Sequence, residues 1–195
     1  MQGQFGEGSA YWLYGVKMLL VIPLLAFVWP HVKELRWRFS PEAVIAGILV
    51  FALWVGLDPH YPKWSDAPES PWNPFTYFES STGIAWIIVV LRILGTTLLV
   101  PPVEEAFYRS FLYRYLTKSD FLSMPLGKFD LRSFIIVSAV FGIAHFEWLP
   151  GILCGLTYQW LVIRKQRLGD AMTAHAITNL LLGLWVVWKG QWQFW

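Results

Sequence analysis

The chain has 195 residues, of which 56% are hydrophobic and 14% are charged, and its formal net charge is +2. A soluble domain usually carries about 25% charged residues, so this composition favours a membrane protein over a soluble one. The small net charge gives no reason to expect a nucleic-acid partner. The length fits one domain, and a single cysteine, Cys154, excludes an intramolecular disulfide.

Apolar segments recur along the first part of the chain, and a helix that spans a bilayer needs about 20 such residues. The first two spans are expected at 11–29, with Trp12 and Trp29 as interfacial anchors, and at 43–57. Residues 58–83 contain five prolines, a density that excludes a helix. This region is therefore expected to form one long loop.

The remaining apolar segments follow in the second part of the chain. A third span is expected at 83–100, ended by Pro101 and Pro102, with a helix that resumes over 103–117. Further helices are expected at 133–149, 151–163 and 171–188. We therefore expect an all-α, polytopic transmembrane helix bundle with about six to seven membrane-embedded segments, one of which is a candidate re-entrant helix.

Lysine and arginine are concentrated in three connections, at 30–42, 114–132 and 164–167. Cytoplasmic loops carry an excess of these residues. With all three loops in the cytoplasm, the chain makes six crossings and both termini lie outside, provided that 103–117 does not cross separately. The alternative is a seventh crossing with one basic loop outside. Residues 1–195 contain no repeat or linker, so we expect one integral membrane domain.

Seven ionisable side chains lie within or beside the apolar segments: Arg92, Glu104, Glu105, Arg109, His145, Glu147 and His175. Such groups are costly in lipid and normally face a protein interior or a water-filled cavity. Glu105 and Arg109 are four residues apart, so they can pair on one helix face. Glu104 points about 100° away from that face. His175 and Asn179 form a second polar face, and together these residues predict one shared site.

Simpler explanations exist for several of these residues. A structural ion pair is the preferred interpretation of Glu105 with Arg109. Arg92 can anchor a tilted helix, and Glu147 is expected at the membrane interface beside Trp148. The presence of polar groups on three separate helices nevertheless favours a functional site over three independent structural features.

Three sequence motifs contain most of these residues: EEAFYR at 104–109, FGIAH at 141–145 and HAITN at 175–179. Together they resemble the motifs of the CPBP (Abi) intramembrane proteases. That family includes the type II CAAX prenyl endopeptidases and bacteriocin-processing proteins. The motif-bearing core covers 84–188, and residues 1–83 form accessory N-terminal spans and the proline-rich loop. The WNPFTYF and GQWQFW segments also resemble the branch associated with exosortase sorting systems.

The resemblance implies an intramembrane glutamic endopeptidase that cuts a membrane-associated protein or peptide. It assigns Glu104 as the general base that activates water and His145 as a residue that helps to hold this water. His175 and Asn179 correspond to the pair that stabilises the oxyanion. Such chemistry needs a base within reach of a water and donors that face the developing charge.

Glu105 and Arg109 correspond to the supporting ion pair of the first motif. The resemblance implies no cofactor, a location in the bacterial inner membrane and a link to an exosortase system. A zinc site built from Glu104, His145 and His175 is the main alternative, although the chain lacks the HExxH signature. A non-catalytic immunity or partner protein with the same fold is the second alternative.

Overall fold

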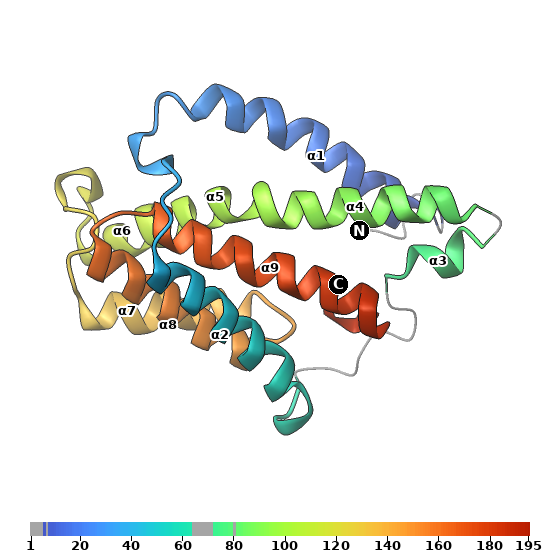
Figure 1. The fold of residues 1–195 in the computed structure, drawn as a ribbon. Coiled ribbons are helices and arrows are strands. Elements are labelled where there is room, and N and C mark those ends of the chain that lie inside the picture. Colours follow the sequence, from blue (N-terminus) through green and yellow to red (C-terminus); the bar gives the residue numbers. More distant parts are fainter. Residues whose placement is uncertain (1–5, 7, 64–71, 80) are drawn as a thin grey trace.

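A computed structural model describes residues 6, 8–63, 72–79 and 81–195 of the chain. These residues form helices and contain no β-strand, which confirms the all-α prediction. The helices are α1 (Ser9–Val28), α2 (Pro41–Leu57), α3 (Pro74–Tyr77), α4 (Thr82–Leu98), α5 (Val100–Glu105), α6 (Tyr113–Thr117), α7 (Leu131–Ile143), α8 (Trp148–Lys165) and α9 (Gly169–Lys189) (Figure 1). A π-helix, Ala106–Leu112, joins α5 to α6.

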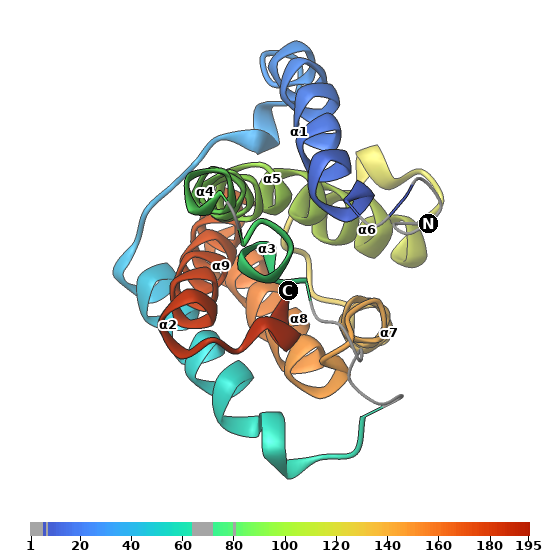
Figure 2. The ribbon, with the colours of Figure 1, turned by 90° about the vertical axis from the view of Figure 1, so that its right-hand side faces the viewer.

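Helix α9 runs through the middle of the bundle and packs against α2, α4 and α8 (Figure 2). Small residues permit this central position. Ala171 is fully buried, and a Cβ atom added to Gly47 of α2 would lie 2.6 Å from the carbonyl oxygen of Ala174. His175 and Asn179 follow on the same helix, so two of the predicted site residues belong to its most enclosed element.

Helices α7 and α8 form a tightly packed pair. A Cβ atom on Gly155 would lie 2.8 Å from the Cα atom of Ser138, and one on Gly142 would lie 2.7 Å from the carbonyl oxygen of Trp148. Such small residues allow helix backbones to approach closely in membranes. The short connection between the two helices carries His145, which is therefore held by a rigid pair.

The predicted interruption near Pro101 and Pro102 is present but amounts to a single residue. Helix α5 follows α4 after the single residue Leu99, and Thr82–Thr117 forms one helical stretch of 36 residues. The two prolines occupy the first turn of α5, where the missing N–H groups cost little. This stretch rises about 54 Å, which exceeds the ~30 Å hydrocarbon core. A separate re-entrant helix is thus not needed to accommodate 103–117.

The π-helix changes which residues face inward after the first motif. In a π-helix, each turn contains more residues than in an α-helix, and such segments often occur at functional sites. Arg109 and Arg114 are five residues apart, and both are buried, with exposed fractions of 1% and 5%. An unbroken α-helix would place residues at this spacing on different faces.

Helix α1 lies on the outside of the bundle and packs against α4 (Figure 2). The Tyr14 hydroxyl donates a hydrogen bond to the carbonyl oxygen of Arg92 at 3.2 Å. A Cβ atom on Gly95 would lie 2.3 Å from this hydroxyl oxygen, so the glycine permits the contact. Much of the rest of α1 is exposed and apolar, including Leu19 and Phe27.

The prediction of one long loop at 58–83 is wrong in part. Asp58–His60 forms a 3₁₀ turn, and Pro74–Tyr77 forms the single-turn helix α3. Proline suits the first turn of α3, where the side chain of Asn73 also caps the helix by accepting from the Phe75 N–H. Residues 64–71 and 80 of this loop lie outside the described residues.

Four helical stretches are long and apolar enough to cross a membrane: Ser9–Val28, Pro41–His60, Thr82–Thr117 and Gly169–Lys189. These stretches and the apolar outer surface indicate an integral membrane protein. The basic connections meet at one end, on the left of Figure 1. There the Arg114 guanidinium lies 3.0 Å from the Glu34 carboxylate, and Lys165 Nζ lies 2.7 Å from that of Glu42. The number of crossings stays a prediction.

Candidate active site

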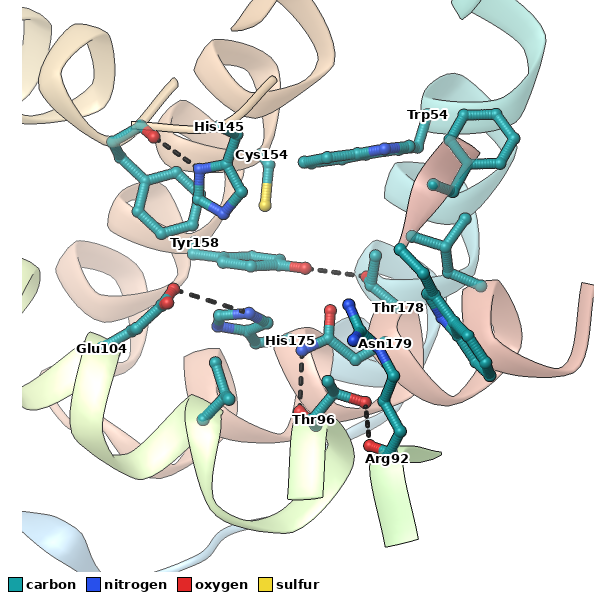
Figure 3. Close-up of a pocket in the computed structure, with 15 residues that line it drawn as sticks. Trp54, Arg92, Thr96, Glu104, His145, Cys154, Tyr158, His175, Thr178 and Asn179 are labelled. Atoms are coloured by element: carbon teal, nitrogen blue, oxygen red, sulfur yellow. Dashed lines mark hydrogen bonds and ion pairs between the residues drawn. The ribbon is translucent and has the colours of Figure 1, made fainter. Parts of the chain in front are cut away.

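A cavity of about 190 Å³ lies among α2, α4, α5, α7, α8 and α9. Glu104, His145, His175 and Asn179 all line it (Figure 3). These residues come from the three sequence motifs, which are separated by up to seventy-five positions in the chain. The structure thus brings the four predicted catalytic residues to one cavity, while their roles stay predictions.

The two adjacent glutamates have different surroundings. The Glu104 side chain is 31% exposed and lines the cavity, whereas the Glu105 side chain is 0% exposed and lies behind it. Glu105 Oε1 lies 2.9 Å from His175 Nδ1, a hydrogen-bond distance. Glu104 Oε2 lies 3.9 Å from His175 Nε2, which is too long for a direct hydrogen bond. Only the first of these acids is therefore open to a ligand.

Arg109 compensates the charge of the buried Glu105 carboxylate. Its Nε atom lies 3.2 Å from Glu105 Oε2, and both side chains are almost completely buried. The guanidinium also lies 4.2 Å from the centre of the Phe141 ring, where a cation–π contact is favourable. No nitrogen of this guanidinium makes a hydrogen bond to the described residues. The predicted pairing of Glu105 with Arg109 is therefore present as a charge contact.

The hydrogen bond to Glu105 determines which ring nitrogen of His175 carries the proton. An ionised carboxylate only accepts, so Nδ1 carries the proton that it donates to Glu105. The Nε2 atom faces the cavity side of the ring, where Glu104 lies (Figure 3). It acts as an acceptor when the ring is neutral and as a donor only in the imidazolium form. Tyr158 stacks on this ring with a centroid distance of 5.2 Å, which fixes its orientation.

His145 lies at the start of the connection between α7 and α8. Its Nδ1 atom lies 2.7 Å from the carbonyl oxygen of Phe141. Because a carbonyl oxygen only accepts, Nδ1 is the donor and the neutral ring presents a lone pair at Nε2. The ring also packs edge-on against Trp54 at 5.7 Å between centroids. His145 is thus oriented to act on the cavity through Nε2.

Asn179 uses its side-chain amide in a contact that the sequence did not reveal. Its Nδ2 atom donates to the carbonyl oxygen of Thr96 in α4 at 2.8 Å. An amide nitrogen has two hydrogens, so one remains for a ligand. One turn of helix separates Asn179 from His175, as the sequence predicted for a shared face.

Sequence reasoning missed two further residues that line the cavity, Tyr158 and Thr178, and it did not assign Arg92, which also lines the cavity, to the site. The Tyr158 hydroxyl donates to Thr178 Oγ1 at 2.7 Å, and Thr178 donates in turn to the carbonyl oxygen of Gly47. The sequence contains one indication of this network, because Thr178 lies between His175 and Asn179 in the third motif. Arg92 was noted only as an anchor for a tilted helix.

Glu147 is buried, which contradicts its expected exposure at the interface. Tyr61 and Lys63 both donate hydrogen bonds to its carboxylate, and Lys63 also contacts Asp58. Burial and the neighbouring Glu147 carboxylate raise the pKa of Tyr61 to about 12. Burial lowers the pKa of Lys63, but its hydrogen bonds to Asp58 and Glu147 outweigh this effect and raise it overall. These contacts hold the connection that carries His145.

The described residues offer no group of side chains that could bind a metal ion together. Within residues 6, 8–63, 72–79 and 81–195, no three His, Cys, Asp or Glu side chains are placed to hold a metal ion together. Tetrahedral zinc sites need at least three such protein ligands. The zinc alternative therefore gains no support from the arrangement of Glu104, His145 and His175.

A family described as "Type II CAAX prenyl endopeptidase Rce1-like" matches residues 85–181. The match includes all three motifs and every cavity residue named above except Trp54. No curated protein and no solved structure matches the chain significantly.

Proposed function

Because the chain belongs to the Rce1-like family of type II CAAX prenyl endopeptidases, we propose that it is an intramembrane endopeptidase in which Glu104 activates water. The observation that carries this proposal is the difference between the two glutamates. Glu104 is 31% exposed and lines the cavity, whereas Glu105 is fully buried against His175 and Arg109. A general base must reach the water from which it takes a proton, and only Glu104 meets this condition.

The hydrolysis proceeds in two steps. A water in the cavity gives a proton to the Glu104 carboxylate while its oxygen adds to the carbonyl carbon of the scissile bond. The resulting tetrahedral oxyanion collapses, the carbon–nitrogen bond breaks, and protonated Glu104 gives its proton to the leaving amine. The products are a carboxylic acid and an amine, and the base returns to its ionised form.

The other cavity residues hold the water and stabilise the oxyanion. The Nε2 lone pair of His145 accepts a hydrogen bond from the attacking water. His175 donates to the oxyanion from Nε2 in its imidazolium form, in which Glu105 accepts from Nδ1. The second amide hydrogen of Asn179 supplies another donor. Removal of one such donor typically reduces turnover about 10²- to 10³-fold.

An apolar groove beside the cavity supports a membrane-associated protein or peptide as substrate. The groove has a volume of about 210 Å³ and lies between α1 and the α4–α5 stretch. Val100 and Glu104 line both the groove and the cavity. An apolar segment of the substrate can thus lie in the groove while the peptide bond reaches Glu104.

Glu104→Gln and Glu105→Gln are the variants that test this proposal. Gln keeps the shape of Glu104 but takes no proton, so cleavage of a membrane-anchored peptide should fall about 10²- to 10⁴-fold. The melting temperature should stay near that of the unchanged protein, because Glu104 is not part of a buried ion pair. Normal turnover in the purified Glu104→Gln variant would refute the assignment, and loss only in Glu105→Gln would move the role to that residue.

We also infer a location in the bacterial inner membrane, with the basic end of the bundle in the cytoplasm. The clustering of Arg114, Lys165 and the other basic residues at one end supports this orientation. Labelling of single cysteines introduced at each end, in intact cells and in lysates, tests it. Equal labelling of both ends in intact cells would contradict the orientation. The link to an exosortase system stays a prediction that neighbouring genes can test.

A further inference from the structure

Glu147 is the buried side chain of the short connection between α7 and α8, residues 144–147. Its exposed fraction is 4%, whereas Ala144 and Phe146 are exposed and His145 is half-buried. The backbone of this connection is not helical, so no ladder of helical hydrogen bonds fixes it. His145 lies two residues before the buried carboxylate, and its position therefore depends on what holds Glu147.

Two side chains of the segment that follows α2 hold the Glu147 carboxylate. Lys63 Nζ forms an ion pair with Glu147 Oε2 and lies 2.6 Å from Asp58 Oδ1. The Tyr61 hydroxyl donates to the same Glu147 oxygen, and its ring packs edge-on against Trp148 with a centroid distance of 5.6 Å. Removal of Lys63 would leave a carboxylate buried without its cation, which is unfavourable.

The end of α2 contacts the same connection a second time, at His145 itself. The Trp54 ring lies edge-on against the His145 ring with a centroid distance of 5.7 Å. Trp54 precedes Asp58 by one turn of helix, so both contacts come from the same end of α2. All of these partners precede residues 85–181. They therefore belong to a part of the chain that the family match does not include.

We propose that Lys63 and Glu147 are positioning residues for His145 in the hydrolysis. Neither side chain lines the cavity, and the pair acts by fixing the connection so that His145 Nε2 points to the water that Glu104 activates. This inference rests on the proposed function and deepens it, because it names residues that affect the reaction without touching the substrate. A misplacement of about 1 Å can reduce turnover about 10²-fold, so loss of the pair should lower kcat.

Steady-state kinetics of Lys63→Met and Glu147→Gln, with a membrane-anchored fluorescent peptide in nanodiscs, test this role. Each change should lower kcat about 10- to 100-fold. KM should stay within about 2-fold, because the residues that contact the substrate are unchanged. Lys63→Arg keeps the charge and should retain most of kcat. Lys165→Met is a matched control, since Lys165 is 19% exposed, compared with 23% for Lys63, and pairs with Glu42 at the opposite end of α2. It should keep the normal kcat.

A second experiment separates positioning from a general loss of structure. The residual turnover of His145→Ala is measured with excess enzyme, with and without Glu147→Gln. If the pair acts through His145, Glu147→Gln should lower this turnover no further, because the residue on which it acts is already absent. A structural role would lower turnover by the same factor in both backgrounds, and that result would overturn the proposal. Lys63→Met gives the same comparison where Glu147→Gln fails to fold, since Lys63 is partly exposed.

The same set of variants distinguishes a failure of the positioning role from a failure of the proposed function. Normal turnover of Glu104→Gln would refute the proposed hydrolysis, whatever the effect of the pair. Loss of activity in Glu104→Gln and His145→Ala, together with normal turnover in Lys63→Met and Glu147→Gln, would refute the positioning role alone. A large increase in KM at unchanged kcat would also overturn it, because the pair would then shape the substrate site.

Discussion

Replacement of Arg109 by alanine should destabilise the protein before it affects chemistry. The Glu105 side chain is 0% exposed and that of Arg109 is 1% exposed, so the variant leaves a carboxylate buried with His175 as its remaining partner. Breaking a buried pair costs about 3–5 kcal/mol. For a chain of this size, each kcal/mol lowers the melting temperature by about 2–4 °C. The expected decrease is therefore roughly 6–20 °C.

Tryptophan fluorescence during heating in detergent measures this change, and two further variants make the result specific. Arg132→Ala removes an exposed arginine and should change the free energy of unfolding by less than about 0.5 kcal/mol. Glu105→Gln combined with Arg109→Met removes both charges but keeps an oxygen that can accept from His175. This double variant should recover much of the lost stability. A melting temperature of Arg109→Ala equal to that of Arg132→Ala would refute the structural role of the pair.

Three other predictions concern the site and the ends of its helices. Asn179→Ala should reduce turnover about 10²- to 10³-fold with little change in KM, which steady-state kinetics would measure. A large loss in melting temperature would instead show that Asn179 has a structural role through its contact with Thr96. Arg167→Ala should lower the melting temperature, because Arg167 is the ion-pair partner of the buried Asp170; unchanged unfolding would contradict this. Chelator treatment should leave peptide cleavage unchanged, whereas loss of activity that added zinc restores would favour the metalloprotease alternative.

Local sequence spacing was sufficient to predict much of the candidate site. The four-residue spacing of His175 and Asn179 places both on one helix face, and the cost of polar groups in lipid directs such a face into the protein. The same spacing predicted the contact between Glu105 and Arg109, which is present within the π-helical region. Hydrophobicity alone predicted the helical class, because an apolar chain in a bilayer must satisfy its backbone groups internally.

Features that depend on distant partners were not predictable in this way. Glu147 was expected at the interface from its position beside Trp148, and its burial could not be predicted because its partner Lys63 is 84 residues away in the chain. The rings around Arg92 come from Trp72 and Trp195, which lie in the proline-rich loop and at the end of the sequence. The sequence also did not show how short the interruption before Pro101 and Pro102 is, because a proline pair normally marks a helix end, whereas α5 begins one residue after the end of α4.

The outer position of α1 has a kinetic consequence if substrates reach Glu104 through the groove between α1 and α4. A substrate that arrives this way diffuses in the plane of the bilayer and is never dissolved in the surrounding water. The quantity that sets the rate is then the number of substrate molecules per lipid rather than per litre. Addition of empty lipid at constant amounts of enzyme and peptide would dilute the reactants within the surface. Turnover measured in detergent micelles and in vesicles should therefore be compared at equal mole fraction.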